Sequence, residues 1–365
     1  MATQRIVTAD STDLHEESFN LSLRPQSLDD YVGQPSLVEK LRITLAAVKQ
    51  RDEPMEHVLL HGPPGLGKTT LSHIIAAEMG THVTVTAGPA LTKGGDLVGT
   101  LTKLQRGDVL FIDEIHRLPA AVEEFIYPAM EDFKIDFTID TGMNAKTIPI
   151  TLKPFTLIGA TTRAGLLSGP MRSRFGITHN LEFYSQPDLL KILQRSARLL
   201  GLVPTPSPNL SDTDAEPDGS AGLVAALTTI AARSRGTPRI ANRLLRRVRD
   251  YAQVKAAGRL TPRLVDAALT LEGVDALGLD EIDRKYLTAI GTTYRGGPVG
   301  LEAVAATLGE DSGTLESMVE PFLLQTGFLA RTRKGRMLTE AGARHVGVAF
   351  HPPEAEASEH SLFNG

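Results

Sequence analysis

The sequence predicts a three-part chain: an α/β P-loop domain with a parallel sheet and flanking helices, an all-helical domain, and a C-terminal winged helix. The first part is indicated by residues 57–70, HVLLHGPPGLGKTT, in which an apolar strand runs into a glycine-rich loop and then into a helix. Residues 185–275 indicate the second part, because their apolar residues keep helical spacing. Residues 280–346 indicate the third, with helical segments followed by a hairpin that has a basic turn.

Length and composition restrict the class of protein. A chain of 365 residues is too long for one ordinary core, so two or three domains are expected. The net charge of −5 indicates no strong attraction of the whole protein to a polyanion, so any basic surface is local. The absence of cysteine excludes disulfides, thiolate zinc sites and a cysteine nucleophile. With neither a signal-peptide layout nor a membrane-spanning apolar run, we expect a cytoplasmic protein.

The loop from Gly62 to Thr69 predicts a site for a nucleoside triphosphate. Its glycines allow backbone N–H groups to close around phosphate oxygens, Lys68 brings a positive charge to the outer phosphates, and Thr69 offers a hydroxyl to Mg²⁺. The helix that follows directs its N-terminal dipole at the same anion. The alternative, a Gly/Pro-rich surface turn, is disfavoured by the strand before the loop and the helix after it.

The residues before the P-loop fall into two segments. Residues 1–20 are polar and show no period, so we expect a flexible leader. Residues 21–34 contain an Arg-Pro pair, which favours extended backbone, and a helical stripe follows them. This position ahead of the P-loop strand leaves two interpretations open: the segment wraps over the base of a bound nucleotide, or it is a structural lead-in.

Two further apolar strands end in groups that suit phosphate chemistry. Asp113 and Glu114 end the first strand; in P-loop enzymes one such carboxylate holds Mg²⁺ and a second polarises the attacking water. The second strand, at residues 155–162, ends in threonine hydroxyls at the edge of the sheet where ligands bind in open α/β folds. These groups are expected to converge with the P-loop.

Arginines at residues 169–176 add a further candidate. Arg172 and Arg174 lie on a short segment far from the P-loop in sequence. An arginine supplied to a γ-phosphate, often by a neighbouring subunit, is a standard part of NTPase catalysis. Considered singly, each is by default a surface arginine.

A hairpin is predicted between the two strands that carry these groups. Apolar residues alternate along both arms of residues 135–152, around a turn rich in Asp, Gly and Asn. One face of the hairpin must therefore pack on something. The residues leave open whether that is the domain's own core or a partner protein.

The C-terminal half is expected to be helical and then basic at one hairpin. Residues 203–221 hold four prolines and no period, so we expect a disordered insertion between helices. Arg239 lies at the start of the next helix, which carries many cations. These cations form a solvated helix face, or Arg239 instead contacts a phosphate of the nucleotide. The six residues from Arg331 to Arg336 carry four cations, which suit backbone phosphates of DNA, with protein docking as the alternative.

The patterns predict a leader at 1–20, an ATPase domain at 21–184, a helical lid at 185–275, a winged helix at 276–346 and a flexible tail at 347–365.

Several motifs together resemble the RuvB family of AAA+ ATPases, the bacterial motors that drive branch migration of Holliday junctions. The resemblance spans about residues 21–346. Its motifs are RPQSLDDYVGQ, HGPPGLGKTTL, DVLFIDEIHRL, YPAMEDF, FTLIGATTRAG, RSRFGI, RGTPRIANRLLRRVRD, GGPVGL and GFLARTRKGRM. The insertion at 203–221 and the tail from 351 depart from the family's usual lengths without breaking a motif.

The resemblance implies a role for each matching residue. It implies ATP and Mg²⁺ as ligands, Glu114 as the group that activates water, Thr162 as sensor 1, Arg239 as sensor 2, and Arg174 as an arginine finger that acts on the next subunit, with Arg172 in reserve. It also implies that Arg331 and Arg336 contact DNA. The nucleotide and metal positions that it implies are Leu23, Arg24, Gly65, Lys68, Thr69, Thr70, Asp113, Glu131, Asp132, Phe133 and Tyr184.

The resemblance further implies an assembly. It predicts an ATP hydrolase that forms a homo-hexameric ring on duplex DNA at Holliday junctions, engages RuvA through the hairpin at 135–152, works with RuvC, and has no membrane partner. Two rival classes are a clamp-loader-like AAA+ switch and a protein-remodelling AAA+ ATPase. The winged helix and hairpin argue against the first. The absence of an aromatic residue from the expected pore-loop stretch, 92–101, argues against the second.

Overall fold

The computed structural model describes residues 23–138, 147–202 and 219–352, and it divides the chain into two compact units. One unit contains residues 9–245 and the other begins at Arg246, so the border lies inside one helix, α9 (Pro238–Lys255). We describe each unit by itself. None of the helices in the described ranges is long and apolar enough to cross a bilayer.

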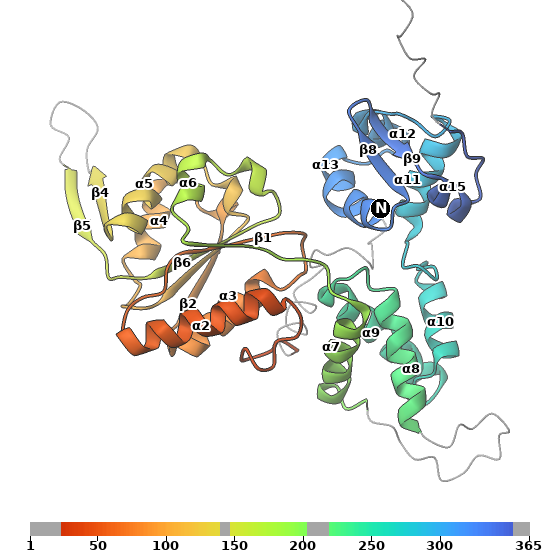
Figure 1. Cartoon of the computed structure of the whole chain (residues 1–365), viewed down its shortest axis with the longest axis horizontal. Helices are drawn as coiled ribbons and strands as arrows, with labels where there is room; N and C mark the ends of the chain where they lie inside the picture. Colours follow the sequence, from red (N-terminus) through yellow and green to blue (C-terminus); the bar gives the residue numbers. More distant parts are fainter. Residues whose placement is uncertain (1–22, 139–146, 203–218, 353–365) are drawn as a thin grey trace, which may run out of the picture. The chain divides into compact units, whose positions relative to one another are not determined.

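A five-stranded parallel sheet forms the centre of the first unit (Figure 1). Its order is β2-β3-β6-β1-β7, so the strand that follows the hairpin in sequence lies between the P-loop strand and the acidic strand. The strand β6 is buried along its whole length and β3 up to its last residue, Asp113, as expected for central strands covered on both faces. The strands are β1 (Val58–His61), β2 (Val83–Ala87), β3 (Val109–Asp113), β6 (Thr156–Thr161) and β7 (Ile177–Asn180).

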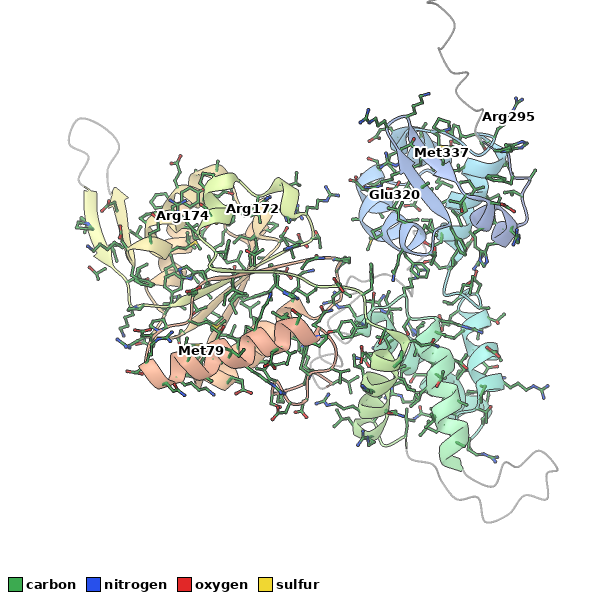
Figure 2. All side chains as sticks on the ribbon, in the orientation of Figure 1. Met79, Arg172, Arg174, Arg295, Glu320 and Met337 are labelled. Atoms are coloured by element: carbon green, nitrogen blue, oxygen red, sulfur yellow. The ribbon has the colours of Figure 1, made fainter. Side chains whose placement is uncertain are left out.

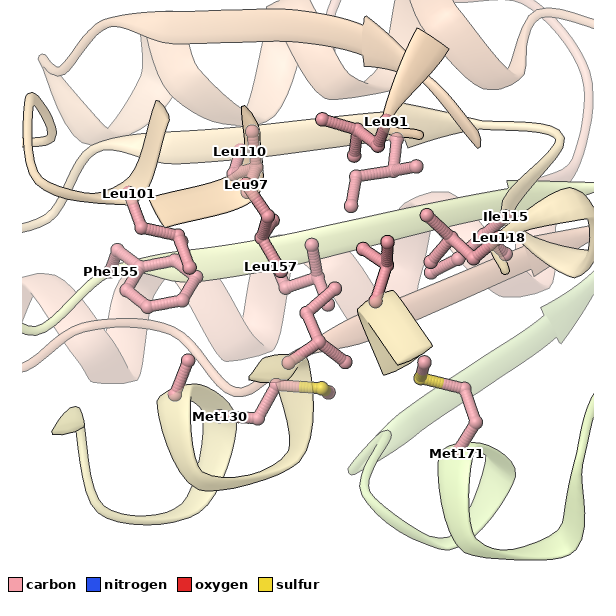
Figure 3. Packing of buried hydrophobic residues seen from close by; sticks show 14 of the residues in the cluster. Leu91, Leu97, Leu101, Leu110, Ile115, Leu118, Met130, Phe155, Leu157 and Met171 are labelled. Atoms are coloured by element: carbon pink, nitrogen blue, oxygen red, sulfur yellow. The ribbon is translucent and has the colours of Figure 1, made fainter. Parts of the chain in front are cut away.

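Helices cover both faces of the sheet because its side chains alternate. Leu110 and Leu157 face a core shared with α4, α5 and α6, and Met130 and Met171 from the helices belong to the same cluster (Figure 3). Figure 1 shows α2 and α3 on the opposite face. The helices are α2 (Pro35–Arg51), α3 (Lys68–Met79), α4 (Gly94–Leu101), α5 (Ala120–Glu131) and α6 (Gly169–Ser173).

The hairpin β4 (Lys134–Thr138) and β5 (Thr147–Thr151) joins α5 to β6. Ile135 at its base is buried in the domain core, whereas Ile148 is 44% exposed. The base of the hairpin therefore packs on the domain's own core, as one interpretation expected, and the outer half exposes an apolar side chain. Docking of that outer half on a partner protein stays a prediction. The turn at residues 139–146 lies outside the described residues.

Four helices follow the sheet: α7 (Gln186–Leu199), α8 (Gly219–Ala232), α9, and α10 (Pro262–Leu271). Local sequence sets the starts of α7 and α10, since the side chains of Ser185 and Thr261 accept the backbone N–H groups of Asp188 and Leu264. The expected insertion is wrong in its last three residues, because α8 already begins at Gly219. Residues 203–218 lie outside the described residues.

The rest of the second unit is a winged helix: α11 (Glu281–Thr292), α12 (Leu301–Leu308), the short α13 (Ser312–Thr314), a π turn (Leu315–Val319), α14 (Glu320–Gln325), the wing strands β8 (Leu329–Thr332) and β9 (Gly335–Leu338), and α15 (Glu340–Val346). Its core gathers apolar residues from all of the longer helices and from the wing. Val348 also packs on this core, so the folded chain extends past the expected end at 346. The expected leader, and the tail from residue 353, lie outside the described residues.

His57 is a buried polar group that joins three elements of the sheet domain. Its Nδ1 accepts the N–H of Leu157 at 2.9 Å, so its Nε2 carries the proton and donates to the carbonyl of Met130 at 3.0 Å. Burial lowers the pKa of His57 below its usual 6.5, although the Met130 bond and Glu56 act in the opposite direction. The ring is therefore neutral, and it stabilises the junction of β1, β6 and α5.

Replacing His57 tests this junction. His57→Leu strands a buried N–H and a buried carbonyl, so we expect the free energy of unfolding to fall by about 2–4 kcal/mol. Because the folded-state pKa of His57 is lowered, the stability that this residue contributes is fully present above about pH 6.5. It is lost as the pH falls through the lowered pKa. The variant should lose part of this pH dependence in denaturant titrations at pH 7.5 and 5.5. His82→Leu, at a side chain 94% exposed, is the matched control and should change neither quantity.

Candidate nucleotide-binding site

The P-loop of the first unit has the backbone that phosphate binding requires. Gly62, Gly65 and Gly67 all have positive φ, at 136°, 78° and 98°. A Cβ at Gly62 would lie 2.6 Å from the carbonyl oxygen of Leu181, so a side chain has no space there. These conformations are open to glycine and strained for other residues. The loop therefore lies close to the neighbouring backbone and turns directly into α3.

Lys68 is the first residue of α3 and folds back over the loop. Its Nζ donates to the carbonyls of Gly62 at 2.8 Å and Pro63 at 2.9 Å, and the residue is only 7% exposed. The P-loop backbone therefore fixes the position of the Lys68 ammonium. A positive charge at the N-terminus of a helix, among backbone N–H groups, forms a site for an anion such as a triphosphate.

The acidic pair lies at the carboxyl end of β3. Asp113 accepts the N–H of Glu114 at 2.9 Å, and Glu114 has a left-handed backbone with φ 47°. Burial raises the pKa of Asp113, while the Glu114 N–H bond and the charges of Lys68 and Arg239 act to lower it. The carboxylate therefore lies within electrostatic reach of both cations. Its position at the sheet edge suits a metal that neutralises phosphate.

Two neighbours hold the carboxylate of Glu114. Thr162 Oγ1 donates to both of its oxygens, at 3.0 and 3.2 Å, and His116 Nδ1 lies 3.1 Å from Oε2. Thr161 Oγ1 in turn lies 2.8 Å from His116 Nδ1. Sequence reasoning missed His116. The available signal was its place two residues after the acidic pair, where a single 3₁₀ turn returns it to the same sheet edge.

One pocket gathers most of the expected nucleotide residues. Its lining comes from the lead-in before α2, the P-loop, the ends of β3 and β6, and the helical part of this unit, including Ile192, Arg195 and Asn242. Lys68, Asp113 and Glu114 therefore converge, as a hydrolase needs. The expected residues in this lining are Leu23, Arg24, Gly65, Lys68, Thr69, Thr70, Asp113, Glu114, Thr162, Tyr184 and Arg239.

The lead-in before α2 belongs to the pocket wall. The hydroxyls of Tyr31 and Tyr184 lie 2.8 Å apart, Tyr184 donates to the carbonyl of Leu66 at 3.3 Å, and Arg195 donates to the carbonyl of Leu23 at 2.6 Å. Burial raises the pKa of Tyr184 to about 12, so its hydroxyl stays protonated. For the described part of this segment, residues 23–34, the structure favours the interpretation that places it at the nucleotide pocket.

Four expected residues do not line this pocket. Arg174 Nη2 pairs with Glu131 Oε1 at 3.0 Å, its Nη1 donates to the carbonyl of Pro170 at 2.7 Å, and its guanidinium carbon lies 4.4 Å from the centre of the Tyr127 ring. Figure 2 shows Arg172 and Arg174 together at α6. Glu131, Asp132 and Phe133 do not line this pocket either, so their expected place around a nucleotide stays a prediction. Those three residues close α5 instead, and Phe133 packs on His57 and Phe155.

The wing differs from the expected basic turn. Arg331 and Arg336 lie on β8 and β9, directly opposite each other, and only Arg333 and Lys334 form the turn. Both strand arginines pair with Glu320, whose side chain is fully buried. The four cations are thus divided between two that are bound to a carboxylate of the same chain and two at the tip.

The chain matches three family models in succession. They are the Holliday junction DNA helicase RuvB P-loop domain over residues 23–181, the RuvB AAA lid domain over 223–275, and the RuvB C-terminal winged helix domain over 276–347. It is 57% identical over 329 residues to the Holliday junction branch migration complex subunit RuvB of Desulfosudis oleivorans, covering 90% of this chain and 91% of that protein.

Solved structures agree with this match. The Thermotoga maritima RuvB Holliday junction branch migration motor is 50% identical with a TM-score of 0.77, over 90% of this chain and 100% of that one. A point mutant of the same protein gives 50% identity and a TM-score of 0.78 over the same shares.

A P-loop with converging acidic and hydroxyl groups, an AAA lid and a winged helix define a nucleotide-binding AAA+ ATPase that acts on DNA. The models that match, and the close relatives, narrow this class to one family. The chain belongs to the RuvB family of Holliday junction DNA helicases.

Removing the charge of Lys68 tests the pocket. Lys68→Met keeps an unbranched stem of similar size but no ammonium, so we expect affinity for a fluorescent ATP analogue to fall at least about tenfold, or roughly 1.4 kcal/mol. Lys103→Met, at an exposed lysine of the same domain, is the control and should bind the analogue as wild type does. Equal affinity of the Lys68 variant and wild type would show that the loop is not the anion site.

Proposed function

We propose that this chain is the motor of a RuvAB-type branch-migration complex: a hexameric ring that translocates on duplex DNA and hydrolyses ATP at the interfaces between its subunits. The proposal rests on one observation: within one chain, Arg174 is separated from the residues that line the nucleotide pocket. Lys68, Glu114 and Thr162 line the pocket, whereas Arg174 lies outside that lining. A complete site then needs the arginine of a second copy.

The chemistry within one chain is general-base hydrolysis. Lys68 and the P-loop N–H groups hold the outer phosphates, and Glu114 takes a proton from the attacking water. Thr162, bonded to both oxygens of Glu114, fixes the direction in which that carboxylate points. Arg239, which lines the pocket from α9, suits a contact with phosphate from the helical side.

Oxygen donors in the pocket fit a magnesium ion. Thr69 at the first turn of α3 and Asp113 at the end of β3 both line it, and Mg²⁺ prefers oxygen ligands that it shares with substrate phosphates. These two residues would hold the ion. When bound, it would neutralise charge on the phosphates.

Arg174 suits action on a neighbouring subunit. Its guanidinium is already oriented by Glu131 and by the Tyr127 ring, so little side-chain entropy is lost when it meets a phosphate. A finger supplied in trans makes hydrolysis depend on assembly. The nucleotide state of one subunit can then change the geometry of the next.

The pocket also connects hydrolysis to movement. Ile192, Arg195 and Arg239 reach it from helices, while the P-loop reaches it from the sheet. Release of phosphate removes a ligand shared by these elements and changes the angle between them. We place the functional borders at an ATPase domain of 21–184, a lid of 185–275 and a winged helix that begins at 276 and runs past the expected 346 to include Val348.

The winged helix is the part of the chain that we propose binds DNA. Arg331 and Arg336 suit backbone phosphates, and phosphate contacts carry no sequence information. That property fits a motor that must move over any sequence. We infer duplex DNA at Holliday junctions as the substrate, RuvA and RuvC as partners, and the cytoplasm as the location. A clamp-loader-like switch is disfavoured by the family match over 90% of the chain.

A mixing experiment tests the shared site. Arg174→Ala should bind ATP but lose hydrolysis by about 10³-fold, as expected when an arginine finger is removed. Added to wild type in increasing fractions, it should lower ATPase activity more than in proportion, because each mutant subunit disables a neighbour's site. Arg172→Ala is the comparison variant and should retain most activity. Additive mixing, or loss of activity on the Arg172 change instead, would contradict the assignment of Arg174.

The exposed half of the hairpin is the proposed contact with RuvA. Ile148→Asp places a charge on this apolar surface, so we expect affinity for RuvA, measured by surface plasmon resonance, to fall about tenfold or more while ATPase activity without RuvA is unchanged. Ile43→Asp, at an isoleucine 63% exposed on α2, is the matched control. Equal losses from both substitutions would exclude the hairpin as the specific contact.

A further inference from the structure

A fully buried carboxylate lies behind the wing of the C-terminal unit (Figure 2). Glu320 Oε1 accepts the hydroxyl of Tyr286 at 2.5 Å and Arg336 Nε at 2.8 Å. Its Oε2 accepts Arg331 Nε at 2.9 Å, Arg331 Nη2, and Arg336 Nη2 at 3.3 Å. A buried charge is tolerated only when it is paired and hydrogen-bonded, and five donor contacts meet that condition here.

The backbone is specialised at this point. A π turn, Leu315–Val319, immediately precedes Glu320, and Pro321 follows it. Proline has no N–H to donate, and single π turns inside helices frequently mark functional sites. The extra residue of the π turn alters which side of the helix the next side chain faces. Glu320 is thereby directed at the wing rather than at solvent.

Without Glu320 the repulsion between the two wing arginines would be offset less, because Glu316 Oε1 lies farther from them, at 3.7 Å from Arg331 Nη2 and 4.0 Å from Arg336 Nη2. Arg331 and Arg336 are direct partners across the β8–β9 pair, and like charges at such positions are destabilising. Glu320 binds Nε and Nη2 of each guanidinium, and Nη1 of each takes no part in these contacts. Arg331 keeps 43% of its side chain exposed and Arg336 keeps 19%.

We propose that Glu320 is a positioning residue for DNA binding, which holds Arg331 and Arg336 side by side as one preformed phosphate-binding pair. The proposal rests on the proposed function, in which these arginines bind the DNA backbone. Holding both guanidiniums in place lowers the entropy that is lost when phosphate is bound. Burial acts to raise the pKa of Glu320, but the bonds from Arg336, Tyr286 and Arg331 together outweigh it and lower the pKa, so the carboxylate stays ionised.

The proposal predicts a sign opposite to that of simple electrostatics. Removing a negative charge from a DNA-binding surface should tighten binding if charge alone matters. If Glu320 positions the arginines, Glu320→Gln should instead weaken binding, because the guanidiniums separate. The full-length protein and a fluorescent duplex distinguish the two by anisotropy across a range of salt concentrations.

We expect Glu320→Gln to bind duplex DNA about tenfold more weakly, with the slope of log K against log salt reduced by about 0.9 for each phosphate that the variant no longer neutralises. Glu340→Gln, at a carboxylate 66% exposed on α15, removes the same charge from the same unit and should bind as tightly as wild type or slightly more tightly. Binding by Glu320→Gln as tight as that of wild type, or tighter, would overturn the proposal. If Glu320→Gln does not fold, the DNA affinity of Glu320→Asp is compared with that of wild type instead. This variant keeps the negative charge, but its shorter side chain cannot hold both guanidiniums in place, so it should also bind DNA more weakly.

A variant cycle separates positioning from loss of fold. In the Arg331→Ala/Arg336→Ala background, Glu320→Gln should cause no further loss of DNA affinity, because its effect passes through those arginines. A further tenfold loss there would show that Glu320 only maintains the fold. Wild-type DNA affinity of the Arg331→Ala/Arg336→Ala variant would instead overturn the wing's proposed role in DNA binding, and the positioning proposal with it.

Discussion

The placement of β6 between β3 and β1 is the constraint on which the nucleotide site depends. In this parallel arrangement the P-loop, Glu114 and Thr162 follow the carboxyl ends of three adjacent strands, so they meet at one edge. The close packing needs Gly159 within β6, since a Cβ there would lie 2.9 Å from the ring of Phe175 and 3.0 Å from Ile115. The chemistry of the site is thus tied to the packing of the core beneath it.

Carboxylates of the same chain hold the arginines that are proposed to meet phosphate. Glu131 holds Arg174 beside the Tyr127 ring, and Glu320 holds Arg331 and Arg336 behind the wing. In each case a long, flexible side chain is fixed before a ligand arrives, which reduces the entropy lost on binding. The two carboxylates differ in burial, and therefore in the desolvation free energy that their hydrogen bonds must offset. Glu131 is half exposed, whereas Glu320 is fully buried and depends on every one of its donors.

Elements with strong local signals were predictable, and those without were missed. The sequence of β3 is a continuous apolar run, so a strand ending at Asp113 and Glu114 was expected and is observed. The start of α10 also has strong local signals, an N-cap threonine and a proline in its first turn. The strand β7, ITHN, has a single apolar side chain and is a strand because β1 pairs with it. The helix α8 has apolar residues on all sides, which leaves no amphipathic stripe to read. The last helix, α15, is short and also escaped prediction.

The sequence by itself determined the class of chemistry, because a glycine-rich loop with Lys68 and Thr69, and an acidic pair after an apolar strand, are local patterns whose spacing carries their meaning. It also supplied the order of the three parts and the motifs that place the chain in its family. Only the tertiary structure decided which residues share a pocket. It joined His116 and Thr162 to Glu114, excluded Glu131 and Arg174 from the lining, and put Glu320 behind the wing. These contacts join residues on different elements, and packing rather than local sequence sets the distance between them.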